Sequence, residues 1–396
     1  FLLTARVEKG TLLGLELLGD ASAAPGILRA LGATAIVCAM SGNFVQRGEP
    51  ALIRKHLRAA AAVDCGGDLV LELPTPWAMA TAEIFARGGV SLLQMAGCDH
   101  IAFGSERGDT ALLQQVAESF SASEYDWLLR RFLDGGITFA AARQQAVGQM
   151  LGDEAASVLS QPNDTLAVEY LRAARELGAE MTPMAVQRVG AMHDGEAEGG
   201  IASGSYVRRL VWEGKLQRGC QFLPAVMADA LRWEVQQGTA ADVGYAQRAI
   251  LAHLRKCGPD DLAPYDGGGE GLYRRLHDAC RQGRDLEEIL FLAKTKRYTA
   301  ARLRRMVMAA WLELVRETET PPYARVLAAN EKGRQLLRQM QDRGVPVLTK
   351  AADAAALGGA AARLMEQEGR YTDLHGLCRE KVSPCGEEYR TSPVMK

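Results

Sequence analysis

The feature that most constrains the fold is the alternation of short apolar runs with helical stretches in the first half of the chain. The runs ATAIVCAM (33–40), DLVLELP (68–74) and DHIAFGSE (99–106) have the length and composition of buried strands. Helical patterns over 51–66 and 79–97 separate them. Strands that alternate with helices are joined by right-handed crossovers, so the sequence predicts an α/β fold with a parallel sheet.

The pattern changes in the second half of the chain. A further strand over 184–190 is expected to return to the sheet, and a Ser-Gly-Ser turn opens a helix over 201–214. Beyond it, long helical segments follow one another. The sequence therefore predicts a first domain over 1–218 and a mainly α-helical C-terminal domain over 219–396, with the boundary near 215–222.

Composition excludes several classes of protein. The net charge of -2 gives no overall attraction to nucleic acid, so such a partner must meet a local basic patch. The eight cysteines contain no C-x-x-C pair and fit a reducing cytosol, which predicts a cytoplasmic protein. No apolar run approaches the roughly 18 residues of a membrane span, and no signal peptide is expected. The six histidines show no metal-ligand spacing, so no protein metal site is predicted.

Two strands run directly into loops rich in polar residues. MSGNFVQRGEP (40–50) follows the first strand, and another loop begins after Phe103. Ligands of parallel sheets bind beyond the carboxyl ends of the strands, which favours ligand binding at both loops. Gly104 would let the backbone approach a nucleotide, or it serves a simple tight turn. Asn43 and Arg47 would contact ligand or RNA, or they form a structural turn in which Asn43 bonds its own backbone.

Eight motifs follow one another along the chain: MSGNFVQRGEPA (40–51), DLVLELP (68–74), AEIFARGGVSLL (82–93), FGSE (103–106), QPNDTLAVEYL (161–171), QRVGAMHD (187–194), IASGSYVR (201–208) and KTKRYTAARLRRM (294–306). Together they resemble one family, the bacterial tRNA(Met) cytidine acetate ligases of the nucleotidyltransferase superfamily. The resemblance implies a Rossmann-like ATP-binding domain followed by a helical tRNA-binding domain. It also implies that acetate and ATP form acetyl-adenylate, normally with Mg²⁺, and that the acetyl group passes to N4 of the wobble cytidine in elongator methionine tRNA.

Other candidate ATP contacts lie near predicted element ends. Asn163 would hold a ribose or base edge, or it caps the helix over 161–178. Arg188 would grip phosphate, or it forms a surface ion pair. The predicted helix over 201–214 begins with small hydroxyl residues, and such a helix N-terminus is a natural anion site. The alternative is an ordinary capped helix. The resemblance assigns ATP binding to Gly104, Asn163, Arg188, Val189, Ser203, Ser205 and Arg208.

The strongest basic cluster is KTKRYTAARLRR (294–305), in which six of twelve residues are Lys or Arg. In a nearly neutral chain this is the best candidate for phosphate contacts with tRNA, although charge runs are usually solvated helix faces. Tyr298 would stack on an unpaired base or lie in the core. The predicted tRNA-binding residues are Lys294, Lys296, Arg297, Arg302, Arg304 and Arg305.

One segment departs from the family pattern. Residues 9–30 contain no histidine and lack the Asn-Pro-Phe-His-x-Gly-His element whose histidines meet the ATP phosphates in the family, which makes 1–32 atypical. A frame disruption or true decay of the site would explain this. No catalytic residue is assigned. Two alternatives stay open: a non-catalytic RNA-binding relative, and another small-molecule nucleotidyltransferase, against which the basic helical domain argues.

Overall fold

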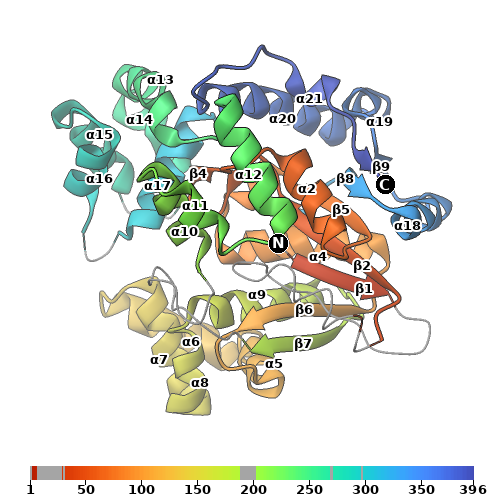
Figure 1. The fold of residues 1–396 in the computed structure, drawn as a ribbon. Coiled ribbons are helices and arrows are strands. Elements are labelled where there is room, and N and C mark those ends of the chain that lie inside the picture. The colour runs from red at the N-terminus through yellow and green to blue at the C-terminus, as the bar shows by residue number, and fades with distance from the viewer. Residues whose placement is uncertain (1, 7–28, 30–31, 188–201, 268–270, 296–297) are drawn as a thin grey trace.

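The computed structural model describes residues 2–6, 29, 32–187, 202–267, 271–295 and 298–396 (Figure 1). Within these ranges no helix is long and apolar enough to cross a membrane. The strands are β1 (Leu2–Arg6), β2 (Ala35–Ser41), β3 (Phe44–Val45), β4 (Glu49–Pro50), β5 (Leu69–Leu73), β6 (His100–Ser105), β7 (Thr182–Gln187), β8 (Ala324–Ala329), β9 (Val347–Leu348) and β10 (Val394–Met395).

Helices surround these strands and fill most of the chain between them. They are α2 (Lys55–Asp64), α3 (Thr75–Ala78), α4 (Ala82–Ala96), α5 (Thr110–Ser119), α6 (Ser123–Asp134), α7 (Phe139–Leu151), α8 (Asp153–Val158), α9 (Pro162–Glu176), α10 (Gly204–Trp212), α11 (Leu216–Cys220), α12 (Ala225–Gln237), α13 (Val243–Lys256), α14 (Pro259–Leu262), η1 (Ala263–Tyr265), α15 (Leu272–Gln282), α16 (Leu286–Ala293), α17 (Ala300–Trp311), α18 (Glu331–Asp342), η2 (Ala351–Asp353), α19 (Ala354–Leu357), α20 (Gly359–Leu377) and α21 (Glu387–Arg390).

The central sheet has the strand order β10-β8-β5-β2-β1-β6-β7, and β9 pairs with β8. β2 is parallel to β5 and β6 is parallel to β7, while β1 lies between β2 and β6 and is antiparallel to both. The strands expected from the sequence therefore all point in one direction, and the α/β class is confirmed. β8 is antiparallel to β5. Because neither β1 nor β8 follows from the apolar pattern, the mixed character of the sheet is new information.

Alternate residues of the inner strands enter different cores, because successive side chains of a strand point to opposite faces. Val37 and Leu71 lie in the large core shared with α4 and α9, whereas Ile36 and Val70 lie in a smaller core shared with α2. Both faces of the sheet are therefore covered by helices. This explains why β2 and β5 read as continuous apolar runs rather than as alternating ones.

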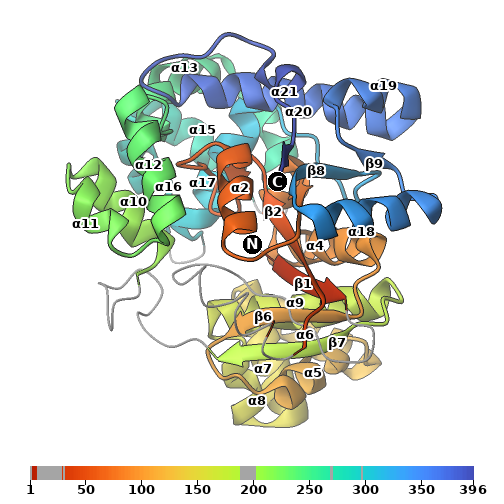
Figure 2. The same cartoon turned by 45° about the vertical axis from the view of Figure 1, so that its right-hand side comes forward.

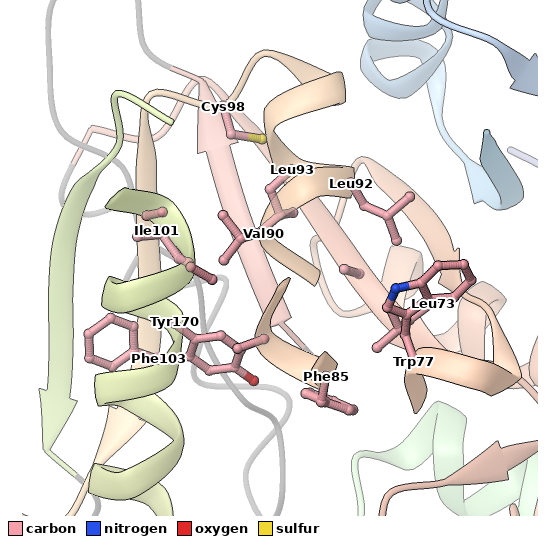
Figure 3. Packing of buried hydrophobic residues seen from close by; sticks show 14 of the residues in the cluster. Leu73, Trp77, Phe85, Val90, Leu92, Leu93, Cys98, Ile101, Phe103 and Tyr170 are labelled. Atoms are coloured by element: carbon pink, nitrogen blue, oxygen red, sulfur yellow. The ribbon is translucent and has the colours of Figure 1, made fainter. Parts of the chain in front are cut away.

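The large core joins α4, α9 and β6 (Figure 3). Val90 and Leu93 of α4 belong to the same cluster as Phe103 of β6 and Tyr170 of α9, and the rings of Phe103 and Tyr170 are tilted with centroids 6.1 Å apart. This packing fixes the carboxyl end of β6 against α9. It thereby positions the loop after β6, which the sequence singled out.

A glycine in the middle of α4 has a packing reason. A Cβ on Gly88 would lie 2.6 Å from Cδ1 of Trp77, whose indole is buried against the helix. Glycine weakens a helix interior by up to about 1 kcal/mol relative to alanine. Here the absence of a Cβ permits the close approach of a large aromatic side chain.

The last part of the chain returns to the sheet. β8 is buried along its whole length and pairs with β5, and Leu336, Leu337 and Met340 of α18 join the large core. In Figures 1 and 2, α18–α21 cover the β8 end of the sheet, and α5–α8 gather at the β6–β7 end. The second predicted domain thus contributes strands to the first sheet. The domain boundary at residue 218 remains a proposal, and the second domain so defined includes strands β8, β9 and β10 of the central sheet.

The remaining helices form separate packing units. α13, α15, α16 and α17 share one apolar core, and α10, α11 and α12 share another with the segment before α2. Both units adjoin the hairpin of β3 and β4, because Phe44 lies in the first core and the chain next to Pro50 carries Ile53 into the second. The hairpin is therefore the point where the helical units meet the sheet.

Candidate functional site

The loop after β6 is tied to the start of α9. Gly104 lies within β6, beside Val186 of β7, so it belongs to the sheet rather than to a turn after it. Two residues later, Glu106 accepts a hydrogen bond from Nδ2 of the buried Asn163 at 2.7 Å. The structure thus brings the predicted residues Gly104 and Asn163 to the same edge of the sheet.

Glu106, rather than a residue of α9, caps the helix. Its carboxylate accepts from the backbone N–H of Asn163 at 3.2 Å and from that of Asp164 at 2.9 Å. The alternative in which Asn163 is the N-cap is wrong: Gln161 occupies that position and its side chain makes no capping hydrogen bond. A carboxylate at a helix N-terminus is stabilised by the free N–H groups and the dipole.

Asp164 completes this network and escaped sequence reasoning. Its Oδ1 accepts from the Ser105 hydroxyl and from the backbone N–H of Glu106 at 2.9 Å, and its side chain is fully buried. Burial raises the pKa of Asp164. The other oxygen, Oδ2, is buried without a hydrogen-bond partner among the described residues. An isolated Asp in a helical pattern gives no periodic signal, so only its place beside Asn163 pointed to it.

The loop over 40–50 is held from behind by buried polar side chains. Asn43 is buried, and its Nδ2 donates to the Thr372 hydroxyl of α20 at 3.0 Å, so this side chain ties the loop to a distant helix. Arg58 donates to the carbonyl oxygens of Ser41, at 3.0 Å, and Gly42. The first part of this loop is thus a fixed scaffold rather than a surface free to bind.

A buried ion-pair cluster supports the same scaffold. Nζ of Lys55 lies 2.7 Å from Oε1 of Glu72 and 2.6 Å from Oε2 of Glu388, and Thr372 donates to Glu388 at 2.8 Å. Burial opposes the ammonium charge, but the carboxylates of Glu388 and Glu72 raise the pKa of Lys55 above its usual value. A paired buried charge of this kind fixes a geometry, because removing one partner strands the other in the protein interior.

The β3–β4 hairpin packs against α17 through a glycine. Gly48 has φ of +72°, and a Cβ there would lie 2.4 Å from the backbone nitrogen of Arg305. Both the conformation and the space exclude other residues. Arg305 also donates to the carbonyl oxygen of Gln46 at 3.4 Å.

One carboxylate on this hairpin is shared by two helices. Glu49 forms an ion pair with Arg208 of α10, and its Oε1 lies 3.5 Å from Nε of Arg304 in α17. Arg47 of the hairpin donates to the hydroxyl of Ser205 in α10. Residues assigned to ATP and residues assigned to tRNA therefore meet around a single hairpin. The sequence does not reveal this meeting, because these residues lie far apart along the chain. Glu49 was missed because a lone acid in a polar loop has no distinguishing pattern.

The N-terminus of α10 has the expected form. Ser203 is the N-cap, and its hydroxyl accepts from the backbone N–H of Tyr206 at 3.2 Å. Nε of Arg208 is buried without a hydrogen-bond partner among the described residues. A capped helix start with an arginine donor to spare suits an anion, and the ATP role of Ser203, Ser205 and Arg208 stays a prediction.

The basic cluster is partly engaged within the protein. Arg302 lies 3.3 Å from Asp266, and its guanidinium is 5.3 Å from the ring centroid of Tyr298. Tyr298 is buried in the core with α17, as its alternative interpretation had it. Burial, and then repulsion from Arg302 and Arg304, lowers the pKa of Arg305. Lys294 is exposed at the end of α16. Crowded cations of this kind favour an anionic partner.

Four predicted residues, Arg188, Val189, Lys296 and Arg297, lie outside the described residues, as does the atypical segment over 9–28. Among the residues that are described, no group of three or more His, Cys, Asp or Glu side chains is placed to hold a metal ion.

Comparison with known proteins shows which family this chain belongs to. It matches the HIGH Nucleotidyl Transferase family model over residues 26–389. It is 33% identical to the tRNA(Met) cytidine acetate ligase of Thermoanaerobacter sp. (strain X514), over 91% of this chain and 92% of that protein. The chain belongs to the tRNA(Met) cytidine acetate ligase family. A second ligase of this name, from Syntrophotalea carbinolica, is 35% identical over 81% of this chain and 78% of the relative.

Solved structures agree with this tRNA(Met) cytidine acetate ligase assignment. Thermotoga maritima TmcAL bound with alpha-thio ATP has a TM-score of 0.89 and 28% identity, covering 97% of this chain and 98% of that one. Its apo form also has a TM-score of 0.89, with 29% identity and coverage of 95% and 96%. The resemblance and fold expected from the motifs are thus confirmed. The family match begins at residue 26, so it leaves out most of the atypical 9–30 segment.

Proposed function

We propose that this chain is an ATP-dependent ligase that forms acetyl-adenylate and acetylates N4 of the wobble cytidine of elongator tRNA(Met). Membership of the tRNA(Met) cytidine acetate ligase family supports the reaction class. The observation that carries the proposal is the shared carboxylate of Glu49, which brings Arg208 of α10 and Arg304 of α17 to one hairpin. A ligase of this kind must hold a triphosphate next to a tRNA, and this junction offers cations for both.

ATP would lie along the edge of the sheet, with its adenosine near Gly104 and Asn163. Its phosphates would extend toward the N-terminus of α10, where the Ser203 and Ser205 hydroxyls and Arg208 supply donors. The Thermotoga maritima relative, described as bound with alpha-thio ATP, supports a nucleotide site in this fold. In the described structure Glu106 accepts from the side chain of Asn163, and Glu49 pairs with one nitrogen of the Arg208 guanidinium. Nucleotide binding would have to replace those contacts.

The proposed reaction has two steps. An acetate oxygen attacks the α-phosphorus of ATP, and pyrophosphate leaves with the electrons of the broken P–O bond. The cytidine N4 amine then attacks the acetyl carbonyl carbon, loses a proton, and expels AMP. Both steps need positioning and charge neutralisation more than a covalent protein nucleophile. Mg²⁺ would accompany the triphosphate. Since the described residues offer no carboxylate cluster for it, we assign it no protein ligand.

The direct test incubates the chain with labelled acetate, ATP and an elongator tRNA(Met) transcript. The proposal expects acetylation that depends on ATP and releases AMP and pyrophosphate. A matched transcript with uridine at the wobble position serves as the control, because it lacks the N4 amine.

A second candidate function rests on the missing histidines of residues 9–30. A chain without the family element would be an RNA-binding relative that performs no chemistry. It would bind the tRNA transcript with salt-dependent affinity and transfer no acetyl group. Grafting the family element into 9–30 separates the cases, because a graft that gains activity shows an intact site elsewhere. A graft that binds tRNA and stays inactive supports the second function.

A further inference from the structure

Two exposed aromatic side chains face one another on the surface of the helical part. Trp212, the last residue of α10, is 37% exposed, and Tyr245, in the first turn of α13, is 47% exposed. Their rings are nearly perpendicular, with centroids 6.2 Å apart and an interplanar angle of 79°. A hollow of about 330 Å³ lies against them, lined by Trp212, Asp242, Gly244 and Tyr245.

This pair is not part of an apolar core. Neither ring belongs to the clusters that hold α10–α12 and α13–α17 together within the described residues. Large aromatic side chains left at a surface hollow mark binding sites more often than packing. One water takes about 30 Å³ of liquid volume, so the hollow has room for a planar ring of nucleobase size.

A carboxylate also lines the hollow. Asp242 caps α13, and its Oδ1 accepts from the backbone N–H of Gly244 at 2.5 Å. Partial burial, and then the charges of Glu380 and Asp242, raise the pKa of Tyr245. Asp242 lies close to the ring, because both residues line the hollow and the Tyr245 N–H donates to the Asp242 carbonyl oxygen at 3.3 Å. A carboxylate next to aromatic faces favours a planar group that carries N–H donors and disfavours a phosphate at the same point.

Arginines flank the pair at the distance of one helical turn. Arg209 precedes Trp212 by three residues on α10, and Arg248 follows Tyr245 by three residues on α13, so each shares a helix face with its aromatic neighbour. Both are exposed.

Rings that meet nearly edge to face at 6.2 Å leave no room for a base between them, so a base would stack on the open face of the pair. Arg248 would then supply a cation for a phosphate next to that base. Arg209 lies over the ring of Tyr206 and 3.8 Å from Glu213, so it would have to leave those contacts to supply a second cation.

We propose that Trp212, Tyr245 and Asp242 form a slot for an unpaired RNA base that carries an exocyclic amino group. Base–aromatic stacking supplies affinity, and Asp242 accepts from the amino group as Asp and Glu do from cytosine N4. The adenine of ATP shares this amino group. The flanking arginines favour a base within an RNA chain, while the proposed nucleotide position lies at Gly104 and Asn163. This inference rests on the proposed tRNA substrate.

The test measures tRNA binding by filter retention over a range of salt concentrations. Replacing both rings, Trp212→Ala with Tyr245→Ala, should weaken tRNA binding about tenfold to a hundredfold, as expected for one lost stacked base. The slope against salt should not change, because no phosphate contact is lost. Trp212→Phe should keep most of the affinity, and ATP binding should be unaltered.

Trp127→Ala is the matched control, since Trp127 of α6 is 58% exposed and lies under Arg131 at 5.4 Å. It should leave tRNA affinity unchanged. The unaltered chain should bind oligocytidylate more tightly than oligouridylate, and Asp242→Asn, which keeps a good helix cap but replaces the carboxylate, should remove that preference. A folded double variant with unaltered tRNA affinity overturns the slot, and so does weakened ATP binding in its place. Failure of the unaltered chain to bind tRNA contradicts the proposed function itself.

Discussion

The β6–α9 junction and the hairpin–α10–α17 junction balance their charges in different ways. At the first, the acids Glu106 and Asp164 accept hydrogen bonds mainly from backbone N–H groups, with the Ser105 hydroxyl and the Asn163 amide as side-chain donors. At the second, the acid Glu49 is shared by the side chains of Arg208 and Arg304. One junction is fixed by the backbone, and the other by long side chains.

This difference indicates which parts of the site can change when ligand arrives. Backbone donors at a helix start cannot move without unwinding the helix, so the β6–α9 junction is preorganised. Exposed or half-buried ion pairs contribute only about 0–1 kcal/mol and are screened by salt. A phosphate can therefore replace Glu49 at the second junction at little cost. We infer that α9 supplies the geometry of the site, and that the hairpin supplies exchangeable charge.

The largest effect is expected on tRNA binding when Lys296, Arg297 and Arg304 are all changed to Ala. We expect affinity to fall on the order of a hundredfold near physiological salt, and the salt slope to flatten by up to about one unit per lost phosphate contact. Filter binding at several salt concentrations measures both. Arg338→Ala with Lys350→Ala, two exposed cations of α18 and of the segment before η2, is the control. Unchanged affinity in a folded triple variant would falsify the assignment of this cluster.

The next effect concerns stability at the β6–α9 junction. Asp164→Ala strands the Ser105 hydroxyl and the Glu106 N–H in a buried place, so we expect the free energy of unfolding to fall by about 2–3 kcal/mol. Urea denaturation measures it. Asp109 is the exposed N-cap of α5, and its Oδ1 accepts from the backbone N–H of Leu112 at 3.0 Å. Asp109→Ala should lower the free energy of unfolding by about 1 kcal/mol. Equal losses in the two variants would mean that the buried network adds nothing beyond a cap.

A smaller effect is expected on ATP when Arg208 is changed to Ala. A charge-assisted contact to phosphate is worth about 1.5–3 kcal/mol, which corresponds to roughly tenfold to a hundredfold in affinity. Calorimetric titration with ATP, in the chain or in the version carrying the grafted family element, measures it. Arg218→Ala should have no effect. If ATP binds the Arg208 variant as tightly as the unaltered chain, Arg208 is a structural partner of Glu49 only.

The sequence revealed the parts of the molecule whose signal is local. β2, β5 and β6 are short apolar runs, and the start of α10 has a Ser-Gly-Ser turn, so each could be predicted. The roles of Glu106 and Glu49 could not, because each depends on a helix that lies far along the chain. β8 was hidden for the same reason: ARVLAA reads as strand or helix, and only pairing with β5 decides. The motif resemblance predicted the family correctly, but it did not predict these contacts.

The smallest effect gives the sharpest contrast between the two junctions. Glu49→Gln removes the negative charge next to Arg208 and Arg304 while keeping the shape of the side chain. Because an ion pair of this exposure contributes about 0.2–1 kcal/mol, the freed guanidinium groups should bind tRNA and ATP up to about fivefold more tightly.

The matched change, Glu106→Gln, should bring no gain, since its amide nitrogen would face a backbone donor of α9 and cost about 1 kcal/mol of stability. Titrations of both variants at two salt concentrations decide the matter, because the gain in Glu49→Gln should shrink as salt screens the charges. If Glu49→Gln instead weakens binding, Glu49 orients the arginines rather than occupying the place of a phosphate, and the two junctions are both scaffolds.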